Sequence, residues 1–464
     1  MSTMGWLERK TGRATPAVTL RSTQERLAAH LRRGTEALSP RVLRRTLDAL
    51  KAVVDPAVSE VEGGRRAGEL VRWYQGATPE QRRDMWLLMS EQFVADPERV
   101  KAAQAQLAAA IGTADEAAAE VLFRRATVSP RRRLLQRFSA DADGVRFLVD
   151  LRAEMQEALK TDRRLRALDV EMEYMFSTWF DVGFLELRRI SWDSPASLVE
   201  KLIKYEAVHD IRSWADVKNR LDSDRRCYGF FHPRLPDEPL IFVEVALLRE
   251  MARSITPLLD ESAATADLRR ATTAIFYSIS NTQSGLRGVS FGDSLIKRVV
   301  EALQREFAQL KTFATLSPIP GLRAWLQKAG AAEYERLPER LRADLPPEAG
   351  DMEGLLRVAN STSTTSTAST ASATDAAVGT DERGAVARAL LRLGARYLAT
   401  AKSPDGRVLD SVARFHLGNG ARIEAINWAA DPSPKGQRQS CGLMVNYHYD
   451  LKRLDRHRTE LAQG

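Results

Sequence analysis

The residues with the clearest chemical pattern lie in a glycine-containing segment, Arg287-Gly288-Val289-Ser290-Phe291-Gly292-Asp293, between an apolar run and an amphipathic helix. Glycine allows the backbone to approach a ligand closely, and the free N–H groups at the start of a helix favour an anion. We therefore expect an anionic group, such as a phosphate, to bind at Gly288–Gly292.

The elements that must position this loop are predicted from their hydrophobic periodicity. Thr273–Ser280 has the β-branched and aromatic content of a strand, and 295–307 has apolar residues on one helical face. A short strand is expected at Thr312–Leu316, followed by a Ser-Pro turn into a further helix. Strands that alternate with helices indicate an α/β or α+β domain.

Ser317 is the first candidate for acid–base or nucleophilic chemistry. A serine before proline often does no more than start a turn or cap a helix. Ser317, however, follows the strand expected at Thr312–Leu316, and ligands of open α/β sheets collect at the carboxyl ends of strands. Its role therefore depends on what the fold places beside it.

His416 is the second candidate, because histidine titrates near neutral pH. It lies in a segment, Ala413–Leu417, that we predict as a strand ending at a Gly418-Asn419-Gly420 hairpin turn. A half-buried structural histidine is the simpler interpretation. No HxxxH pattern, His/Cys cluster or GxSxG elbow occurs in the chain, so no metal ligands are predicted.

The hydrophobic pattern divides the chain into a first part that is helical and a second part that contains both strands and helices. We predict an α+β fold with a helical bundle at 1–181, serving as scaffold or oligomerisation domain, and a catalytic domain at 182–464 with a central mixed sheet. The Ser/Thr-rich stretch 360–380 is predicted to be a disordered loop within the second domain.

Composition excludes several classes of protein. The 464 residues include 69 Lys and Arg against 61 Asp and Glu, a net charge of +8, but the basic residues are dispersed, so nucleic acid is not the expected partner. The sequence has no apolar stretch long enough for a membrane span and no signal core. Its two cysteines exclude a disulfide framework and fit a reducing compartment.

The motif Arg287-Gly288-x-x-Phe291-Gly292-x-x-Leu295-Ile296 resembles the loop of GNAT acyltransferases that holds the coenzyme A pyrophosphate, with Ser290 at the place of the middle glycine. The wider sequence resembles the malonyl-CoA decarboxylase family, whose catalytic domain is GNAT-like. The blocks that carry this resemblance are Tyr228–Leu248, Ala274–Gly321, Arg414–Asp431 and Ser440–Tyr449.

The resemblance implies specific site residues. The family's catalytic serine falls on Ser317, its catalytic histidine on His416 and its active-site tyrosine on Tyr449. The coenzyme A loop falls on Arg287, Gly288, Val289, Ser290, Phe291, Gly292 and Asp293. Ser290 stands where animal members carry an acidic residue.

The expected activity is decarboxylation of malonyl-CoA to acetyl-CoA and carbon dioxide through an enolate. No separate cofactor is expected, because the thioester carbonyl accepts the charge and coenzyme A arrives with the substrate. A GNAT-type acyltransferase and a non-catalytic acyl-CoA-binding scaffold are the alternatives. The resemblance further implies a homo-oligomer, dimer or tetramer, assembled through the helical domain, and the absence of a peroxisomal Ser-Lys-Leu tail indicates a bacterial cytoplasmic enzyme.

Overall fold

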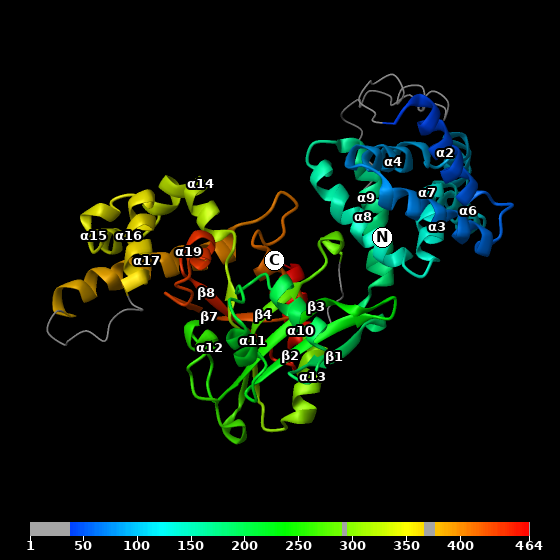
Figure 1. The fold of residues 1–464 in the computed structure, drawn as a ribbon. Helices are drawn as coiled ribbons and strands as arrows, with labels where there is room; N and C mark the ends of the chain where they lie inside the picture. The colour runs from blue at the N-terminus through cyan, green and yellow to red at the C-terminus, as the bar shows by residue number, and fades with distance from the viewer. Residues whose placement is uncertain (1–37, 290–294, 366–375, 464) are drawn as a thin grey trace. The chain divides into compact units, whose positions relative to one another are not determined.

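The computed structural model describes residues 38–289, 295–365 and 376–463. They form two compact units: the first holds the described residues of Met1–Trp179 and Ser284–Val289, and the second holds those of Phe180–Gln283 and Ser290–Gly464 (Figure 1). The main division falls between Trp179 and Phe180, where the sequence places it at 181/182. The short segment Ser284–Val289, expected in the catalytic domain, belongs by its contacts to the helical unit.

The first unit is a bundle of amphipathic helices: α2 (Pro40–Val54), α3 (Glu60–Gly76), α4 (Pro79–Gln92), α5 (Pro97–Ala110), α6 (Glu116–Thr127), α7 (Pro130–Ser139), α8 (Gly144–Leu159) and α9 (Arg166–Trp179). Helix α4 starts where Thr78-Pro79 predicts, with a capping box between Thr78 and Gln81. Aromatic rings join the bundle in its core, where Phe147 packs against Tyr74 and Phe138.

In the described residues of the second unit, eight strands form one mixed sheet in the order β1-β2-β3-β4-β5-β8-β6, with β7 paired to β8. The strands are β1 (Glu186–Ile190), β2 (Arg225–His232), β3 (Leu235–Leu248), β4 (Thr273–Asn281), β5 (Thr312–Thr315), β6 (Ser317–Pro318), β7 (Arg422–Asn427) and β8 (Met444–His448). Among these described strands only β4 and β5 pair in parallel, and their ladder ends at Phe276 and Thr315. Beyond that point β4 continues to Asn281 while paired with β3 alone, so the two strands separate.

Helices cover both faces of this sheet. The described helices of this unit are α10 (Ala196–Tyr205), α11 (Trp214–Arg220), α12 (Thr256–Leu259), α13 (Leu295–Glu306), α14 (Leu322–Glu335), α15 (Glu339–Ala343), α16 (Met352–Thr365), α17 (Ala376–Thr400), α18 (Ser411–Gly418), α19 (Pro434–Ser440) and α20 (Leu454–Gln463), of which α15 and α16 pack on other helices and not on the sheet. Leu202 of α10 packs with Cys227, Phe231 and Phe242 on one face. Arg298 of α13 lies over the Phe230 ring on the other, as strand alternation requires.

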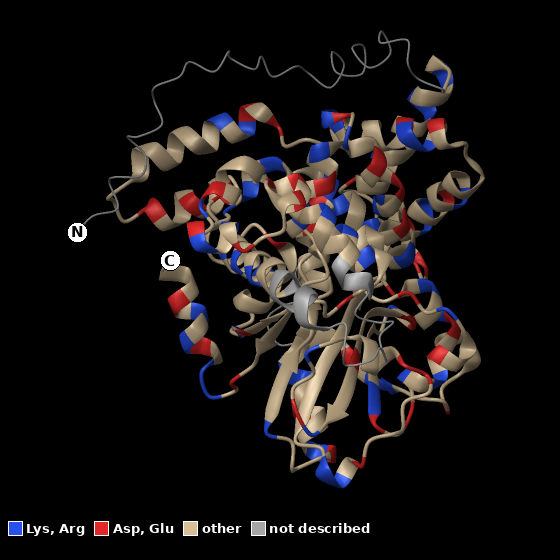
Figure 2. Ribbon diagram, turned by 90° about the vertical axis from the view of Figure 1, so that its left-hand side faces the viewer, with Lys and Arg blue, Asp and Glu red and all other residues tan. Residues whose placement is uncertain are grey.

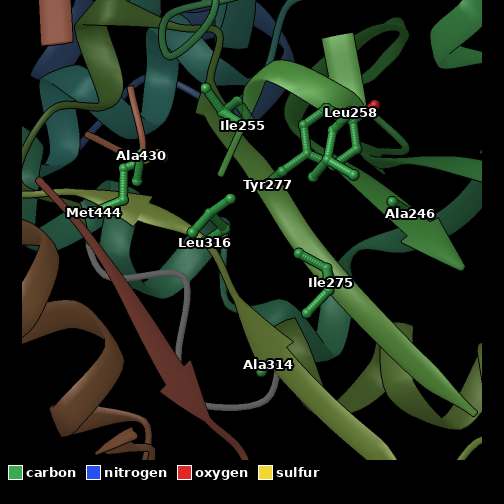
Figure 3. Close-up of a cluster of buried hydrophobic side chains, with 9 residues drawn as sticks. All are labelled: Ala246, Ile255, Leu258, Ile275, Tyr277, Ala314, Leu316, Ala430 and Met444. Carbon is green, nitrogen blue, oxygen red and sulfur yellow. The ribbon is translucent and has the colours of Figure 1, made fainter. Parts of the chain in front are cut away.

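The core beside the separating strands is made mainly of apolar side chains. Ile275 and Tyr277 of β4 pack with Ala314, Leu316 and Met444, and α12 supplies Leu258 (Figure 3). This packing holds β4, β5 and β8 in register next to the point where Ser317 leaves the sheet. The predicted α+β architecture, a helical region followed by a mixed-sheet domain, is confirmed.

The prediction of a disordered loop at 360–380 is wrong at both ends. Helix α16 runs to Thr365 and α17 begins at Ala376, while 366–375 lie outside the described residues. Ala is the most favourable residue in a helix and Ser and Thr are only modestly unfavourable, so the packing of buried neighbours such as Leu355 and Leu390 extends both helices into this stretch.

Charged residues of both signs alternate along the ribbon of the helices (Figure 2). Ion pairs such as Arg82–Glu154 and Arg226–Glu306 account for many of the basic residues. The basic residues are therefore dispersed along the chain and many are paired with acids, as the sequence predicts.

Candidate active site

Ser317 is positioned by pairing with β8 rather than by a turn. It directly follows β5 and Leu316, and in β6 it pairs with Val445 of β8. Proline at 318 cannot donate to a ladder, which limits β6 to a short strand. The Ser317 side chain is 7% exposed, and its hydroxyl donates to Thr315 Oγ1 over 2.9 Å.

His416 lies on helix α18, so the predicted strand at Ala413–Leu417 is wrong. Asp410 is the N-cap of this helix and accepts from the backbone N–H groups of Val412 and Ala413 at 3.0 and 2.9 Å. The helix ends at Gly418 and its C-cap residue is Asn419, so the Gly-Asn-Gly sequence forms a helix end instead of a hairpin turn.

That C-cap has the hydrogen bonds of a Schellman motif. Gly420 has φ +82°, its N–H donates to the Leu417 carbonyl, and the Ala421 N–H donates to the His416 carbonyl. A Gly-Asn-Gly sequence suits both a hairpin and a helix end, and the Asp410 cap decides for the helix.

The structure brings the predicted serine, histidine and tyrosine together. Ser317 Oγ lies 3.2 Å from His416 Nε2, and His416 Nδ1 lies 2.7 Å from the Tyr449 hydroxyl. The imidazole also stacks on Tyr447, with ring centroids 4.6 Å apart. His416 and Tyr449 are 2% and 3% exposed, so the relay is shielded from water.

Burial sets the protonation of this relay. It lowers the pKa of His416 to about 3, so the imidazole is neutral at pH 7 in the ligand-free site. It also raises the pKa of the Tyr449 hydroxyl, which keeps that group protonated. The neutral ring has one donor and one acceptor nitrogen, so it can hydrogen-bond to the Tyr449 and Ser317 hydroxyls in either tautomer.

Two residues missed in the sequence support these groups. Thr315 is fully buried, and its hydroxyl accepts from both Ser317 and the Tyr447 N–H. Asn446 donates to the Thr315 carbonyl at 2.8 Å and accepts from Asn427 at 2.7 Å. Strand alternation could have identified Thr315, since residues two apart share a face. Asn446 carries no comparable signal.

Part of the predicted coenzyme loop is described. Gly288 has φ +84°, a conformation that favours glycine, and Arg287 and Gly288 are exposed. Arg152 of α8 donates from Nη1 to the carbonyls of Gly285 and Arg287 at 2.8 and 2.9 Å. Arg152 thus holds the first half of the loop, and the sequence did not identify it.

The remaining loop residues of the prediction, Ser290, Phe291, Gly292 and Asp293, lie outside the described residues. In the described part of the chain, no group of three or more His, Cys, Asp or Glu side chains is arranged to hold a metal ion. None of the described helices has the length and apolar character needed to cross a membrane.

Two known protein-family domains match this chain, and the boundary between them lies close to the division between the two units. Residues 183–464 match the malonyl-CoA decarboxylase C-terminal domain, and residues 93–180 match the malonyl-CoA decarboxylase N-terminal domain. The chain belongs to the malonyl-CoA decarboxylase family. It is an enzyme of the carboxy-lyase class.

Individual relatives extend over most of the chain. Mitochondrial malonyl-CoA decarboxylase of Anser anser anser is 37% identical over 399 residues, 84% of this chain and 78% of that protein. The Mus musculus mitochondrial enzyme is 38% identical and covers 83% of this chain and 80% of its own length.

Solved structures of bacterial members share the fold. Malonyl-CoA decarboxylase from Agrobacterium vitis has a TM-score of 0.76 at 37% identity, covering 90% of this chain and 96% of that one. The enzyme from Rhodopseudomonas palustris has a TM-score of 0.75 at 38% identity, covering 91% and 96%. The predicted family is therefore confirmed over both units.

Proposed function

We propose that this enzyme decarboxylates malonyl-CoA through an enolate, with Ser317 and His416 acting as a dyad that handles the carboxylate and the proton. The observation that carries the proposal is the buried contact between Ser317 Oγ and His416 Nε2, 3.2 Å apart, in a chain of this family. Such a contact is within the reach that general acid–base catalysis requires.

The reaction needs a place for an electron pair. When the bond to the carboxylate carbon breaks, carbon dioxide leaves and the electrons pass to the α-carbon and the thioester oxygen as an enolate. Backbone N–H groups along the free edge of β4 beyond Phe276 are the candidate donors to that oxygen. One preorganised donor is typically worth about 3 kcal/mol.

The proton then returns to carbon along the buried relay. The Ser317 hydroxyl donates to the α-carbon and takes a proton from His416 Nε2, while Tyr449 supports the ring at Nδ1. Burial holds the pKa of His416 near 3 in the empty site. A malonyl carboxylate bound beside Ser317 raises that pKa, because a nearby opposite charge favours imidazolium. Substrate binding and proton uptake by His416 are therefore coupled.

We assign the coenzyme arm to the loop Arg287–Asp293. Support comes from the positive φ of Gly288, from the exposed Arg287 side chain and from the Arg152 bonds that hold the Gly285 and Arg287 carbonyls. No dissociable cofactor is required by this chemistry. We retain a homo-oligomer built through the helical unit and a cytoplasmic location as parts of the proposal.

The test is release of acetyl-CoA and carbon dioxide from malonyl-CoA by purified protein, with chelator present and no acyl acceptor. We expect stoichiometric release, and loss of it in Ser317→Ala. Ser361→Ala, which removes an exposed hydroxyl from α16, is the matched control and should retain full activity. Intact malonyl-CoA after prolonged incubation with folded protein would contradict the proposal and direct attention to amine acceptors.

A further inference from the structure

Asp410 is a buried acid that the reaction sequence above does not use. It is 2% exposed, and both of its oxygens are occupied. Oδ1 accepts from the first turn of α18, and Oδ2 accepts from the Gly321 N–H at 3.3 Å and the Tyr397 hydroxyl at 3.5 Å. Every group that faces the carboxylate in these bonds is a donor.

These bonds join the segments that carry the two halves of the dyad. His416 lies on α18, whose N-terminus Asp410 caps. Gly321 follows Ser317 by four residues and is the N-cap of α14. One carboxylate therefore meets the N-termini of two helices, both of which favour a negative charge through their dipoles.

Gly321 is needed for this arrangement because of its missing side chain. A Cβ at this position would lie 2.2 Å from the Tyr397 hydroxyl and 3.6 Å from Asp410 Oδ2. Its backbone φ of −90° is ordinary, so the requirement for glycine is steric. The backbone of Gly321, which follows Ser317, thus packs directly against the side chains of Asp410 and Tyr397.

We propose that Asp410 is a positioning residue for the reaction: it fixes the helix of His416 against the turn that follows Ser317 and so sets the distance between Nε2 and Oγ. This inference rests on the proposed dyad. Burial raises the pKa of Asp410, while the backbone donors of Ala413, Gly321 and Val412 oppose that shift. The donors keep the carboxylate oriented, since each oxygen has its own set of partners.

A cleft of about 1040 Å³ reaches the same carboxylate. It is lined by Asp410, Gly321 and Tyr397 together with Trp325, Lys328 and Lys402, among others. A small carboxylate such as formate can enter this cleft when the Asp410 side chain is removed. Chemical rescue is therefore available as a readout.

The experiment compares Asp410→Ala with Asp410→Asn. We expect the alanine variant to lose kcat by roughly 10- to 100-fold, because small displacements of catalytic groups cost about that much. KM for malonyl-CoA should change by less than about twofold, since the coenzyme loop is untouched. Asparagine caps a helix about as well as aspartate, so Asp410→Asn should recover most of the activity. Formate should restore kcat of the alanine variant in a concentration-dependent way.

The matched control is Asp96→Ala. Asp96 caps α5 in the helical unit through two backbone N–H groups, as Asp410 caps α18. We expect that variant to keep its turnover within about twofold, because it loses the same kind of cap from a helix that carries neither member of the dyad. An equal loss of kcat in both variants, or a loss in KM alone, would overturn the positioning role.

Two further measurements keep the inference testable. If Asp410→Ala does not fold, Gly321→Ala displaces Tyr397 while leaving the cap intact, and kcat should fall several-fold; unchanged kcat would contradict the inference.

If the wild-type protein releases no acetyl-CoA, the proposed function fails first. The positioning role is then judged from a crystal structure of Asp410→Ala, or of Gly321→Ala if the former does not fold. An Nε2–Oγ distance still at 3.2 Å would refute it, and a distance beyond hydrogen-bond reach would support it.

Discussion

The sheet of the second unit has a buried polar cluster on each face, and the two differ in charge. Thr315 pairs with Phe276, which pairs with Val245, so these residues share one face with Ser317. Glu244 is the next residue along β3 and therefore points to the opposite face. The Ser317 cluster and the Glu244 cluster are thus separated by the thickness of the sheet.

The Glu244 cluster is built around one buried charge, the guanidinium of Arg220. Arg220 of α11 donates to Asp216 Oδ1 at 2.7 Å, to Glu244 Oε2 at 2.9 Å and to the His209 carbonyl at 2.9 Å. Arg220 and Glu244 are 1% and 0% exposed. Loss of hydration outweighs the attraction of Arg220 and raises the pKa of Glu244 to about 8.

The Ser317 cluster is built from groups that are neutral at pH 7, and its hydroxyls and imidazole can exchange donor and acceptor roles. Because both clusters are buried and have shifted pKa values, these two features do not by themselves mark a catalytic site. The arginine cluster fastens α11 to the sheet, whereas the serine–histidine relay holds groups that can exchange protons. Substitutions in the two clusters should therefore affect different quantities.

The largest expected effect is on turnover in the neutral cluster. His416→Asn should lower kcat by about 10²- to 10⁴-fold, equivalent to about 3–5 kcal/mol of transition-state stabilisation. The free energy of unfolding should change by only about 1 kcal/mol, because no buried charge is left unpaired. Single-turnover assays and urea unfolding measure the two quantities. In Ser317→Ala/His416→Asn the second substitution should add little, since the pair acts as a unit; full additivity would break the dyad assignment.

The next effect is on stability in the ionic cluster. Arg220→Met leaves the buried acid groups of Asp216 and Glu244 without their cationic donor and should cost about 3–5 kcal/mol of unfolding free energy. Turnover per folded molecule should fall much less than in His416→Asn. Adding Glu244→Leu should restore part of the stability. A variant with wild-type stability and no activity would place Arg220 in catalysis and cancel the distinction between the faces.

A smaller effect concerns acid stability. Burial lowers the pKa of His416 from 6.5 to about 3, so the unfolded chain binds more protons at this residue between these values. Stability is therefore present above pH 6.5 and is lost as pH falls toward 3, by about 1.4 kcal/mol per pH unit. His416→Gln should flatten this part of the stability profile by about 2 kcal/mol at pH 5.

His209, which is buried in the ionic cluster with its pKa also lowered to about 3, provides the comparison for that profile. His209→Gln should flatten the acid limb by a similar amount while preserving much more activity than His416→Gln. Urea midpoints measured from pH 4 to 8 would show this. Unchanged slopes in both variants would mean that neither histidine stays neutral in the folded state.

The smallest effect is expected at Tyr449. Tyr449→Phe removes the hydroxyl that lies 2.7 Å from His416 Nδ1 and keeps the ring. We expect kcat to fall by about 3- to 10-fold, or about 1 kcal/mol, as for one neutral hydrogen bond. Tyr174→Phe, at an exposed position of α9, is the control. A loss as large as that of His416→Asn would make Tyr449 a proton donor rather than a support.

Much of the fold followed from periodicity and local signals. The helix at 295–306 and the strands near Thr273 and Thr312 were predicted because apolar residues recur at the spacing of their elements. The helix of His416 was predicted as a strand, because its short apolar segment and the Gly-Asn-Gly sequence suit both structures. Asp410 was the overlooked signal.

The candidate site could be predicted from the sequence only in part. Resemblance assigned Ser317, His416 and Tyr449 to one active site, and strand order implied that Ser317 lies at the end of a strand. The contacts of Asp410 with Gly321 and of Arg152 with Gly285 join residues 89 and 133 positions apart. No local pattern records such pairs.

The sequence by itself determined the composition, the amphipathic helices, the strands and the glycine loop, because these depend on neighbours a few residues away. It also determined the family through blocks of similar residues. The tertiary structure decided which buried polar groups are ionic and which are neutral, and it set the spacing of the dyad. Desolvation and hydrogen-bond distance depend on residues far apart in the chain, and only the packed fold brings those residues together.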